Sequence, residues 1–426
     1  MIYNQILIRF GDLTLKGKNQ RDFVKKELNL INKKLEGLNV NVIKAHERVY
    51  VDLLNEDYKE VIKRLDLVSG LSSYSLVLTS SFDMNEIKEK ALALVKEEIL
   101  NNNEKTTFKV MTRRADKRFP LESMEVTRQV SGFILANNRF PNLTVDVHNP
   151  KNILHIEIRE EGVFLFLNDI KAMGGYPVGV AGKGLLMLSG GLDSPVAGYM
   201  AMKQGIEIEC LHFESTPLTS IESSQKVVDL AKILAKYTPN NKINLLMVPF
   251  KELHMALLEN VDDSYKITVM RRMMFRIADK LVRKRKALCI VTGESVGQVA
   301  SQTLQSMNTI NAVTNIPVIR PLCTTDKVDI VRTSYKIGTY ETSIRPFEDC
   351  CTVYLPVNPA TAPKIDKAEA YEKKFDWEPL VDFCVENTRV ISISTNSTLD
   401  LPSMGFETRE VVDEYKASLS ALKENK

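Results

Sequence analysis

The sequence has 426 residues, and its 57 Lys and Arg against 54 Asp and Glu give a formal net charge of +3. Hydrophobic residues make up 44% and charged residues 26%, which excludes a mainly disordered, collagen-like or low-complexity chain. At roughly 100–200 residues per domain, this length predicts between two and four domains. No apolar run approaches the ~20 residues that a membrane span requires, so we expect no membrane segment.

The N-terminus and the cysteines indicate a cytoplasmic protein. MIYNQILIRFGD lacks the basic start and long apolar core of an export signal, and it is typical of a strand. Six cysteines are too few for a disulfide scaffold in a chain of this length, and no pair has CxxC spacing. We therefore expect reduced thiols and no zinc site, with buried apolar roles for Cys210, Cys289 and Cys384.

Residues 1–80 have a periodicity that predicts the order β-α-β-β-α-β. Strands are expected at 3–10, 39–46, 48–54 and 71–80, and helices at 18–37 and 55–70. This order is typical of a small ferredoxin-like α+β domain. Residues 81–172 form a second predicted α+β domain, with helices at 84–100 and 122–137 and strands around 108–114, 143–150, 152–160 and 162–169. The glycine-rich residues 173–184 then read as a linker.

From residue 185 the pattern changes to short apolar strands alternating with helices. Strands are expected at 185–188, 206–213, 243–250 and 286–294, with a long helix at 264–286. Such alternation predicts an α/β domain with a doubly wound parallel sheet, which we place at 185–395, followed by a C-terminal extension at 396–426. Ligands bind beyond the carboxyl ends of strands in such sheets.

The segment LLMLSGGLDSPVAGYMAMK (185–203) predicts a strand, a glycine turn and a helix. Gly190 and Gly191 would let the backbone adopt positive φ and approach a ligand closely. Free amides at the helix start, with the Ser189 and Ser194 hydroxyls, would make a cradle for phosphate.

Asp193 would be a poor partner for bare phosphate, so we expect Mg²⁺ to bridge this carboxylate to a pyrophosphate group. The plainer interpretation is a glycine-rich turn in which Asp193 only caps the helix. The GxxxxGK[ST] spacing of a Walker A loop is absent.

The SGGxDS turn resembles the PP-loop pyrophosphatases, which use ATP to adenylate a substrate oxygen. Five other segments, taken together and in order, resemble the tRNA 4-thiouridine synthetase (tRNA sulfurtransferase) family. They are RFGDLTLKGKNQRDF, FKVMTRRADKRFP, TGESVGQVASQTLQSM, NIPVIRPLCTTDKVDI and TSIRPFEDCCTVYLP. The resemblance implies a ferredoxin-like domain, a THUMP RNA-binding domain and a PP-loop (adenine nucleotide alpha hydrolase-like) catalytic domain.

The resemblance also implies an activity: sulfur replaces O4 of uridine 8 in tRNA, with ATP and a persulfide donor, and thiazole synthesis for thiamine is served by some members. The family forms homodimers. The sequence ends without the rhodanese-like domain of many members, so we expect a short form that receives sulfur from a cysteine desulfurase or a separate persulfide carrier.

The resemblance assigns site residues by position. ATP contacts fall on Met187, Leu188, His212, Phe213, Arg271, Gly293 and Gln302. The essential lysine falls on Lys327, as a cation for the charge that develops on phosphate, and the catalytic cysteine on Cys350, with Cys351 the alternative. A resolving thiol would come from Cys323 or from the donor. Helical spacing places Arg271 and Arg272 on different faces, so one would reach a phosphate while the other is solvated.

Residues 105–118 hold six basic residues against Asp116 alone, a local charge of +5 that suits an RNA backbone. The predicted RNA-binding residues are Lys109, Arg113, Arg114, Lys117 and Arg118. The neighbouring Phe119 would stack on an unpaired base.

Two other functions stay open from the sequence. A PP-loop ligase that adenylates a small molecule would leave residues 1–170 without a purpose. A non-enzymatic RNA-binding protein with a decayed nucleotide site would lack motif residues, yet Gly190, Gly191, Asp193 and Ser194 are all present.

Overall fold

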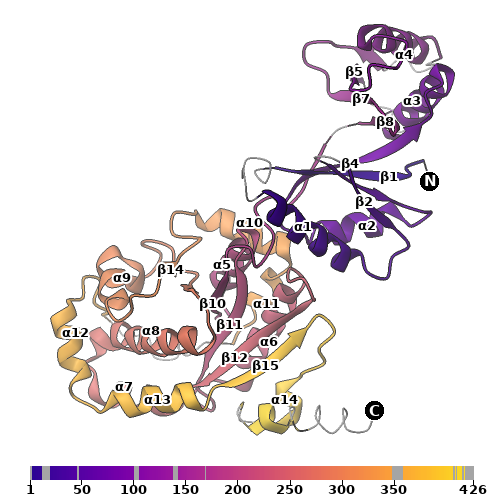
Figure 1. The fold of residues 1–426 in the computed structure, drawn as a ribbon. Coiled ribbons are helices and arrows are strands. Elements are labelled where there is room, and N and C mark those ends of the chain that lie inside the picture. The colour runs from indigo at the N-terminus through magenta and orange to yellow at the C-terminus, as the bar shows by residue number, and fades with distance from the viewer. Residues whose placement is uncertain are drawn as a thin grey trace. The chain divides into compact units, whose positions relative to one another are not determined.

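The computed structural model describes residues 2–11, 20–45, 48–99, 105–137, 143–167, 169–347, 358–405, 408, 410–414 and 417. The chain divides into two compact units, Met1–Tyr176 and Pro177–Lys426. Each is treated by itself below (Figure 1). Within the described ranges, no helix has the length and apolar character needed to cross a bilayer.

Unit 1 contains the predicted β-α-β-β-α-β order and then a second α+β half. The first half comprises β1 (Gln5–Phe10), α1 (Gln20–Leu35), β2 (Asn41–Ala45), β3 (Arg48–Asp52), α2 (Tyr58–Leu65) and β4 (Leu71–Ser80). The second comprises α3 (Met84–Glu98), β5 (Thr106–Arg114), α4 (Ser123–Asn137), β6 (Leu143–Val145), β7 (Asn152–Arg159), β8 (Gly162–Phe166) and β9 (Ile170–Lys171). The ferredoxin-like α+β prediction for the first half is confirmed.

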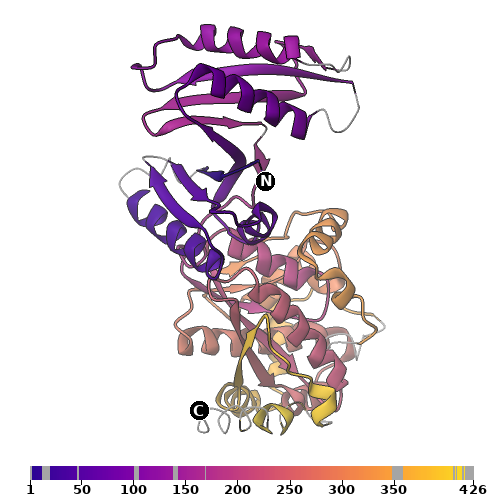
Figure 2. The same ribbon diagram turned by 90° about the vertical axis from the view of Figure 1, so that its right-hand side faces the viewer.

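The strands of both halves form one sheet in the order β2-β3-β1-β4-β8-β7-β5-β6, with β9 also paired to β4. The strand β4 joins the halves because it pairs with β1 along one edge and with β8 along the other. Figures 1 and 2 show β4 running from the half that carries α1 and α2 into the half that carries α3 and α4.

The sheet has a second, smaller core on the face opposite the helices. Alternate strand residues point to opposite faces, so Ile6 and Ile8 pack with the helices while Leu7 does not. The smaller cluster consists of Leu7, Tyr50, Val77, Phe164 and Phe166. The Tyr50 and Phe164 rings stack with centroids 5.0 Å apart, although β1 and β4 lie between their strands in the sheet. The sheet is therefore curled so that its two halves face each other on this side.

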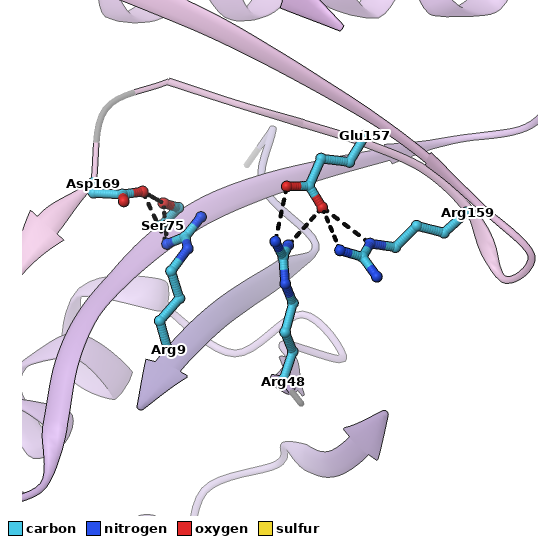
Figure 3. A network of polar contacts seen from close by, with 6 residues as sticks. All are labelled: Arg9, Arg48, Ser75, Glu157, Arg159 and Asp169. Atoms are coloured by element: carbon cyan, nitrogen blue, oxygen red, sulfur yellow. Dashed lines mark hydrogen bonds and ion pairs between the residues drawn. The ribbon is translucent and has the colours of Figure 1, made fainter. Parts of the chain in front are cut away.

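Two arginine clusters join the halves at this smaller core (Figure 3). Arg48 of β3 donates to both oxygens of Glu157 on β7, at 2.5 and 3.0 Å, and Arg159 contacts the same carboxylate at 2.9 Å. Burial alone would raise the pKa of Glu157, but hydrogen bonds and charge from Arg48 and Arg159 hold it below its usual value. The carboxylate is thus ionised and bridges strands from the two halves.

The second cluster joins β1 and β4 to Asp169, which lies between β8 and β9. Arg9 forms an ion pair with Asp169 at 2.9 Å and donates to Ser75, which itself donates to Asp169 at 2.7 Å. The Arg9 guanidinium also lies 5.1 Å from the centre of the Phe166 ring, a cation–π contact. These polar contacts surround the aromatic cluster and fix the curl of the sheet.

Unit 2 is an α/β domain that begins in the predicted linker. Its elements, including the 3₁₀ turns η4 and η5, are β10 (Lys183–Met187), α5 (Asp193–Lys203), β11 (Glu207–Glu214), α6 (Ile221–Ala235), β12 (Lys242–Pro249), α7 (Lys251–Asn260), η4 (Asp263–Tyr265), α8 (Lys266–Lys284), β13 (Cys289–Val291), η5 (Ala300–Gln302), α9 (Leu304–Asn311), β14 (Val318–Ile319), α10 (Lys327–Ile337), α11 (Tyr340–Ser343), α12 (Ile365–Glu372), α13 (Trp377–Glu386), β15 (Arg389–Ser394) and α14 (Leu401–Met404).

The sheet of unit 2 has the order β14-β13-β10-β11-β12-β15. Its strands are parallel from β14 to β12, as predicted, and the edge strand β15 runs antiparallel to β12. The chain moves outward from β10 through β11 to β12 and then returns to β13 on the other side of β10. The carboxyl end of β10 is therefore the switch point at which doubly wound sheets bind ligands.

Helices cover both faces of this sheet. Leu185 packs in a core with Phe275 and Ile277 of α8, while the next residue, Leu186, points to the opposite face against α5. Gly198 of α5 makes room for it, since a Cβ there would lie 2.6 Å from a Leu186 methyl group. The apolar run of β10 therefore reflects burial on two sides, which confirms the doubly wound prediction.

Described residues of the predicted C-terminal extension pack onto unit 2. Leu399, Leu401, Val411 and Val412 are buried. The amide of Thr408 donates to the Thr216 hydroxyl, just beyond β11.

Glu27 of α1 is a buried carboxyl with no hydrogen-bond partner within the described part of the chain. It lies against Gly70, where any Cβ would overlap the carboxyl group. Burial raises the pKa of Glu27 well above its usual value, so the folded protein holds this group protonated.

This raised pKa predicts a stability that falls with pH. The unfolded chain releases the Glu27 proton near pH ~4.3, so the contribution is complete below that value and is lost as pH rises toward the folded pKa, at about 1.4 kcal/mol per pH unit. Glu27→Gln cannot ionise, and its unfolding free energy is expected to fall less than that of the wild type between pH 5 and pH 8. The exposed Glu36→Gln is the control and keeps the wild-type slope. Equal slopes for Glu27→Gln and wild type would contradict a protonated Glu27.

Candidate active site

A cavity of about 570 Å³ opens at the switch point of the parallel sheet, beyond the ends of β10, β11 and β13. Its lining includes every predicted ATP contact except Gly190, and also Asp193. These residues are Met187, Leu188, Ser189, Gly191, Ser194, His212, Phe213, Arg271, Gly293 and Gln302. Apolar side chains, including Ile267 and Met274 of α8, line part of it. The cavity thus combines polar groups with the apolar wall that a nucleotide base requires.

The loop between β10 and α5 is held by two serines. The Ser194 hydroxyl accepts from the amide of Ser189 at 2.9 Å and contacts its carbonyl oxygen at 3.1 Å. The two hydroxyl oxygens lie 3.1 Å apart, and the Gly191 amide donates to the Ser189 hydroxyl. The Ser194 side chain is therefore engaged with the loop itself and keeps the turn in one shape.

The positive φ predicted for the glycines of this loop is wrong. The described glycines with positive φ include Gly179 and Gly182 but neither Gly190 nor Gly191. The loop instead leaves β10 without a left-handed residue, and α5 begins at Asp193 with no side-chain cap on the preceding residue. The helix start therefore keeps its amides uncapped by side chains.

Asp193 does not serve as the helix cap of the plainer interpretation. One carboxylate oxygen contacts Lys327 Nζ at 2.5 Å, and the other accepts from Gln298 Nε2 at 2.8 Å. Lys327 is the first residue of α10, and its side chain is 45% exposed. The pair joins α10 to Asp193, which lines the cavity, whereas Lys327 itself is not among the lining residues.

His212 and Phe213 lie at the end of β11, as expected, and both are buried. The Nδ1 of His212 lies 3.2 Å from the carbonyl oxygen of Leu188, which links β11 to the residue before the glycine loop. The Phe213 ring packs edge-on against Phe250, with centroids 5.2 Å apart. These contacts fix one wall of the cavity.

Arg271 lines the cavity, but the prediction that Arg272 is solvated is wrong. The Arg272 side chain is only 1% exposed and pairs with Glu372 at 2.6 Å, on the other face of α8. Arg271 instead pairs with Glu294 at 2.6 Å. Helical spacing correctly predicts that the two arginines lie on different faces of α8. The partner of Arg272, however, is a buried carboxylate and not solvent.

Gly293 lines the cavity and also lies too close to the backbone of α5 to carry a side chain. A Cβ at Gly293 would lie 2.6 Å from the Ser194 nitrogen and 2.7 Å from the Asp193 carbonyl carbon. The segment after β13 therefore touches the start of α5 directly. Gln302 also shapes this segment, because its side-chain oxygen accepts from the Ser295 amide.

The described cysteines do not include the predicted reactive pair. Cys350 and Cys351 lie outside the described residues. Cys210, Cys289 and Cys384 are buried, as expected, and burial raises the pKa of each thiol, that of Cys384 to about 12. Cys323 is half-buried. Buried thiols with raised pKa values are poor nucleophiles.

The predicted RNA-binding residues lie on β5 and the turn after it, in unit 1. Arg113 and Lys117 are exposed, and Lys109 is half-buried. Arg114 donates to the carbonyl oxygens of Phe119 and Leu121, and Arg118 pairs with Asp116 and Glu160. The charges of Arg113 and Lys117 are therefore the most accessible of the set.

The stacking role predicted for Phe119 is wrong. Its side chain is only 5% exposed and belongs to the core of unit 1, where its ring lies 6.4 Å from that of Phe82. The turn carries this ring inward while the adjacent Lys117 and Arg118 point to solvent.

Sequence reasoning missed three polar residues around the cavity: Glu294, Gln298 and Arg320. Glu294 and Gln298 lie in the segment 292–307 and Arg320 in the segment 315–330, so the family resemblance covers the segments but assigns no role to these three residues. Glu294 and Gln298 pair with Arg271 of α8 and Asp193 of α5, 23 and 105 residues away, and Arg320 pairs with Asn311 of α9, nine residues away. No spacing signals such pairs.

The contact at Gly293 predicts a large effect for a small change. Gly293→Ala is expected to displace the glycine loop and to lower ATP affinity at least tenfold, since misplacement by ~1 Å has effects of this order. Gly132→Ala in α4 is the matched control, because a Cβ there meets nothing within 4 Å. Binding is measured by calorimetry on protein shown to be folded. Unchanged affinity in a folded Gly293→Ala variant would show that the loop tolerates the contact.

Comparison with known proteins agrees with this geometry. Residues 5–75 match the ThiI ferredoxin-like domain, residues 81–168 the THUMP domain, and residues 179–377 the family described as thiamine biosynthesis protein (ThiI). A probable tRNA sulfurtransferase of Acholeplasma laidlawii (strain PG-8A) is 45% identical over 410 residues, which cover 96% of this chain and 98% of that relative.

Two solved structures also resemble the chain. A 4-thiouridine synthetase in complex with RNA and bound ATP is 34% identical, with a TM-score of 0.84 over 92% of this chain and 100% of that one. A protein from Pyrococcus horikoshii Ot3 shares the fold at 23% identity, with a TM-score of 0.60 over 79% of this chain and 99% of that one. Because a relative of 45% identity matches nearly the whole of both chains, the protein belongs to the tRNA sulfurtransferase family.

Proposed function

We propose that this chain is an ATP-dependent tRNA sulfurtransferase that forms 4-thiouridine at uridine 8 of tRNA. The observation that carries the proposal is the cavity at the switch point, where the glycine loop, Arg271 and the segment after β13 meet. The relative of 45% identity and the structural match to a 4-thiouridine synthetase with RNA and ATP support it.

In the first step, O4 of the uridine attacks the α-phosphorus of ATP and pyrophosphate leaves. The amides of the loop between β10 and α5 hold the phosphates at the helix start. Lys327 stabilises the negative charge that develops on them, a role supported by its ion pair with Asp193, which lines the cavity. The wall formed by His212 and Phe213, together with Met274, holds the base.

Asp193 would hold Mg²⁺ together with phosphate oxygens of the nucleotide. The residues fit, because Mg²⁺ is usually bound through one or two carboxylates and substrate phosphates, and the Asp193 carboxylate lines the cavity. When bound, the ion neutralises charge on the pyrophosphate leaving group.

In the second step, sulfur attacks C4 of the adenylated base and AMP leaves. Cys350, or its neighbour Cys351, has one of two roles. It either carries the terminal sulfur as a persulfide, or it attacks the donor's persulfide and releases that sulfur. In both cases a disulfide forms between the cysteine and a second thiol. The second thiol is Cys323 or a cysteine of the donor. The burial of the other three described cysteines supports this choice.

The proposal also covers the sulfur donor, the oligomeric state, the location and the domain boundaries of the protein. The donor is a cysteine desulfurase or a separate persulfide carrier, the protein acts as a homodimer in the cytoplasm, and sulfur for thiazole synthesis is a further use. We propose the domain limits 1–80, 81–172, 185–395 and 396–426, joined by a linker at 173–184. The THUMP match supports RNA binding by the second of these domains.

A reconstituted reaction tests the chemistry. Unmodified tRNA, MgATP, a desulfurase and cysteine are expected to yield 4-thiouridine, detected by its near-ultraviolet absorbance, with one pyrophosphate released per sulfur transferred. Cys350→Ser is expected to abolish thiolation while pyrophosphate release persists, with both products retained in Cys351→Ser; the reverse result would assign the sulfur-carrying role to Cys351. Lys327→Met is expected to suppress both products at least a hundredfold, by analogy with other preorganised charge stabilisers.

The alternatives give different results in this assay. Activity on free nucleosides equal to that on tRNA would favour the small-molecule ligase. Failure of the wild type to release pyrophosphate with tRNA, ATP and Mg²⁺ would refute the adenylation step.

The RNA surface is tested separately, because two of its arginines have partners inside the protein. The double variant Arg113→Ala and Lys117→Ala is expected to weaken tRNA binding and to lower the slope of log K against log[salt] by about one to two. ATP affinity should stay unchanged. The control removes the same charge from α2, by Lys59→Ala and Lys63→Ala, both exposed. An equal loss of tRNA binding in the control would contradict the assignment to β5.

A further inference from the structure

A buried carboxylate lines the cavity, although a negative charge there would by itself repel the phosphates of a nucleotide. Glu294 lines the cavity, and its side chain is only 2% exposed. One of its oxygens accepts from Arg271 Nη2 at 2.6 Å, and the other accepts from Arg320 Nε at 2.7 Å and from the Thr292 hydroxyl at 2.9 Å. Every oxygen of this carboxylate therefore has a partner.

The partners come from three separate elements. Arg271 belongs to α8, Thr292 and Glu294 directly follow β13, and Arg320 directly follows β14. Arg320 is itself fixed, because its Nη2 donates to the Asn311 side chain at 3.1 Å. Burial alone would raise the pKa of Glu294, but the charges of Arg271 and Arg320 lower it, so the carboxylate is ionised.

The net charge of this cluster favours the binding of a nucleotide. Arg271 and Glu294 alone would be neutral, and a neutral pair attracts phosphate weakly. Arg320 adds a second positive charge, which leaves the cluster at +1 at the cavity wall. Among the described residues, Arg271 makes its one side-chain hydrogen bond to Glu294, so most of its five N–H donors are left for a ligand.

We propose that Glu294 and Arg320 are positioning residues for ATP: Glu294 holds the Arg271 guanidinium at the cavity, and Arg320 compensates the carboxylate charge so that Arg271 stays available to the phosphates. This inference rests on the proposed function, because it assigns a role within the same ATP site.

The structure offers a matched control, a second buried carboxylate that pairs with arginines of α8. Glu372 is also buried and is paired with two arginines of α8, Arg272 at 2.6 Å and Arg276 at 2.9 Å. That cluster does not line the cavity. Glu372→Gln therefore removes the same charge from the same kind of buried cluster, and it reports on stability alone.

Glu294→Gln separates orientation from charge. The substitution raises the local charge from +1 to +2, which by itself would tighten ATP binding. Glutamine keeps one acceptor oxygen where the carboxylate offers two, so Arg271 and Arg320 can no longer both be held. Because Arg271 is then released, the KM and the dissociation constant for ATP are expected to rise about tenfold with kcat changed much less. Glu372→Gln is expected to leave both constants unchanged even where its melting temperature falls equally.

Arg320→Met tests the compensating charge. It leaves Glu294 paired to Arg271 alone and should weaken ATP binding several-fold, and Arg320→Lys, which keeps the charge, should weaken it less. The double variant Glu294→Gln with Arg320→Met restores a net +1 and lets one amide oxygen accept from Arg271. It is therefore expected to bind ATP more tightly than Glu294→Gln alone, a coupling that a merely structural role would not produce.

The outcomes distinguish this inference from the proposed function. ATP affinity is measured by calorimetry on the full chain with MgATP. Wild-type affinity in folded Glu294→Gln, or strictly additive losses in the double variant, would overturn the inference while leaving the function intact. Absence of ATP binding by the wild type would instead overturn the proposed function.

Discussion

The direct backbone contact between Gly293 and the start of α5 is the constraint on which the catalytic unit depends. It joins the end of β13 to the glycine loop after β10, and a single methyl group at Gly293 would lie 2.6 Å from the Ser194 nitrogen. Because the two segments touch, the loop, the segment that carries Glu294 and the β11 wall close around one cavity. Parallel strands bring their carboxyl ends to one edge, and this contact turns that edge into a site.

Buried carboxylates between pairs of arginines recur through the molecule with different consequences. Glu157 joins the two halves of the curled sheet in unit 1, Glu372 joins α12 to α8, and Glu294 faces the cavity. In each case the carboxylate is almost fully removed from water and the arginines supply both charge and hydrogen bonds. Only the position of the cluster relative to the cavity gives the third a proposed role in ligand binding.

The first unit shows how one long strand makes a single body from two predicted domains. Because β4 pairs on both edges, the ferredoxin-like half and the THUMP half share a sheet, and its curl buries the aromatic cluster around Tyr50 and Phe164. The curl also explains why arginines at positions 9 and 48 are partly buried among strands rather than exposed on them.

The sequence by itself determined the β-α-β-β-α-β order of the first half, the doubly wound sheet, the family and ten of the residues that were expected to contact ATP and line the cavity, because these depend on local periodicity and on motifs contiguous in the chain. Only the tertiary structure decided which charges meet. The burial of Arg272, the inward turn of Phe119 and the bridge from Arg271 through Glu294 to Arg320 join residues tens of positions apart. A side chain's partner is set by the packing of separate elements, and no periodicity within one element encodes it.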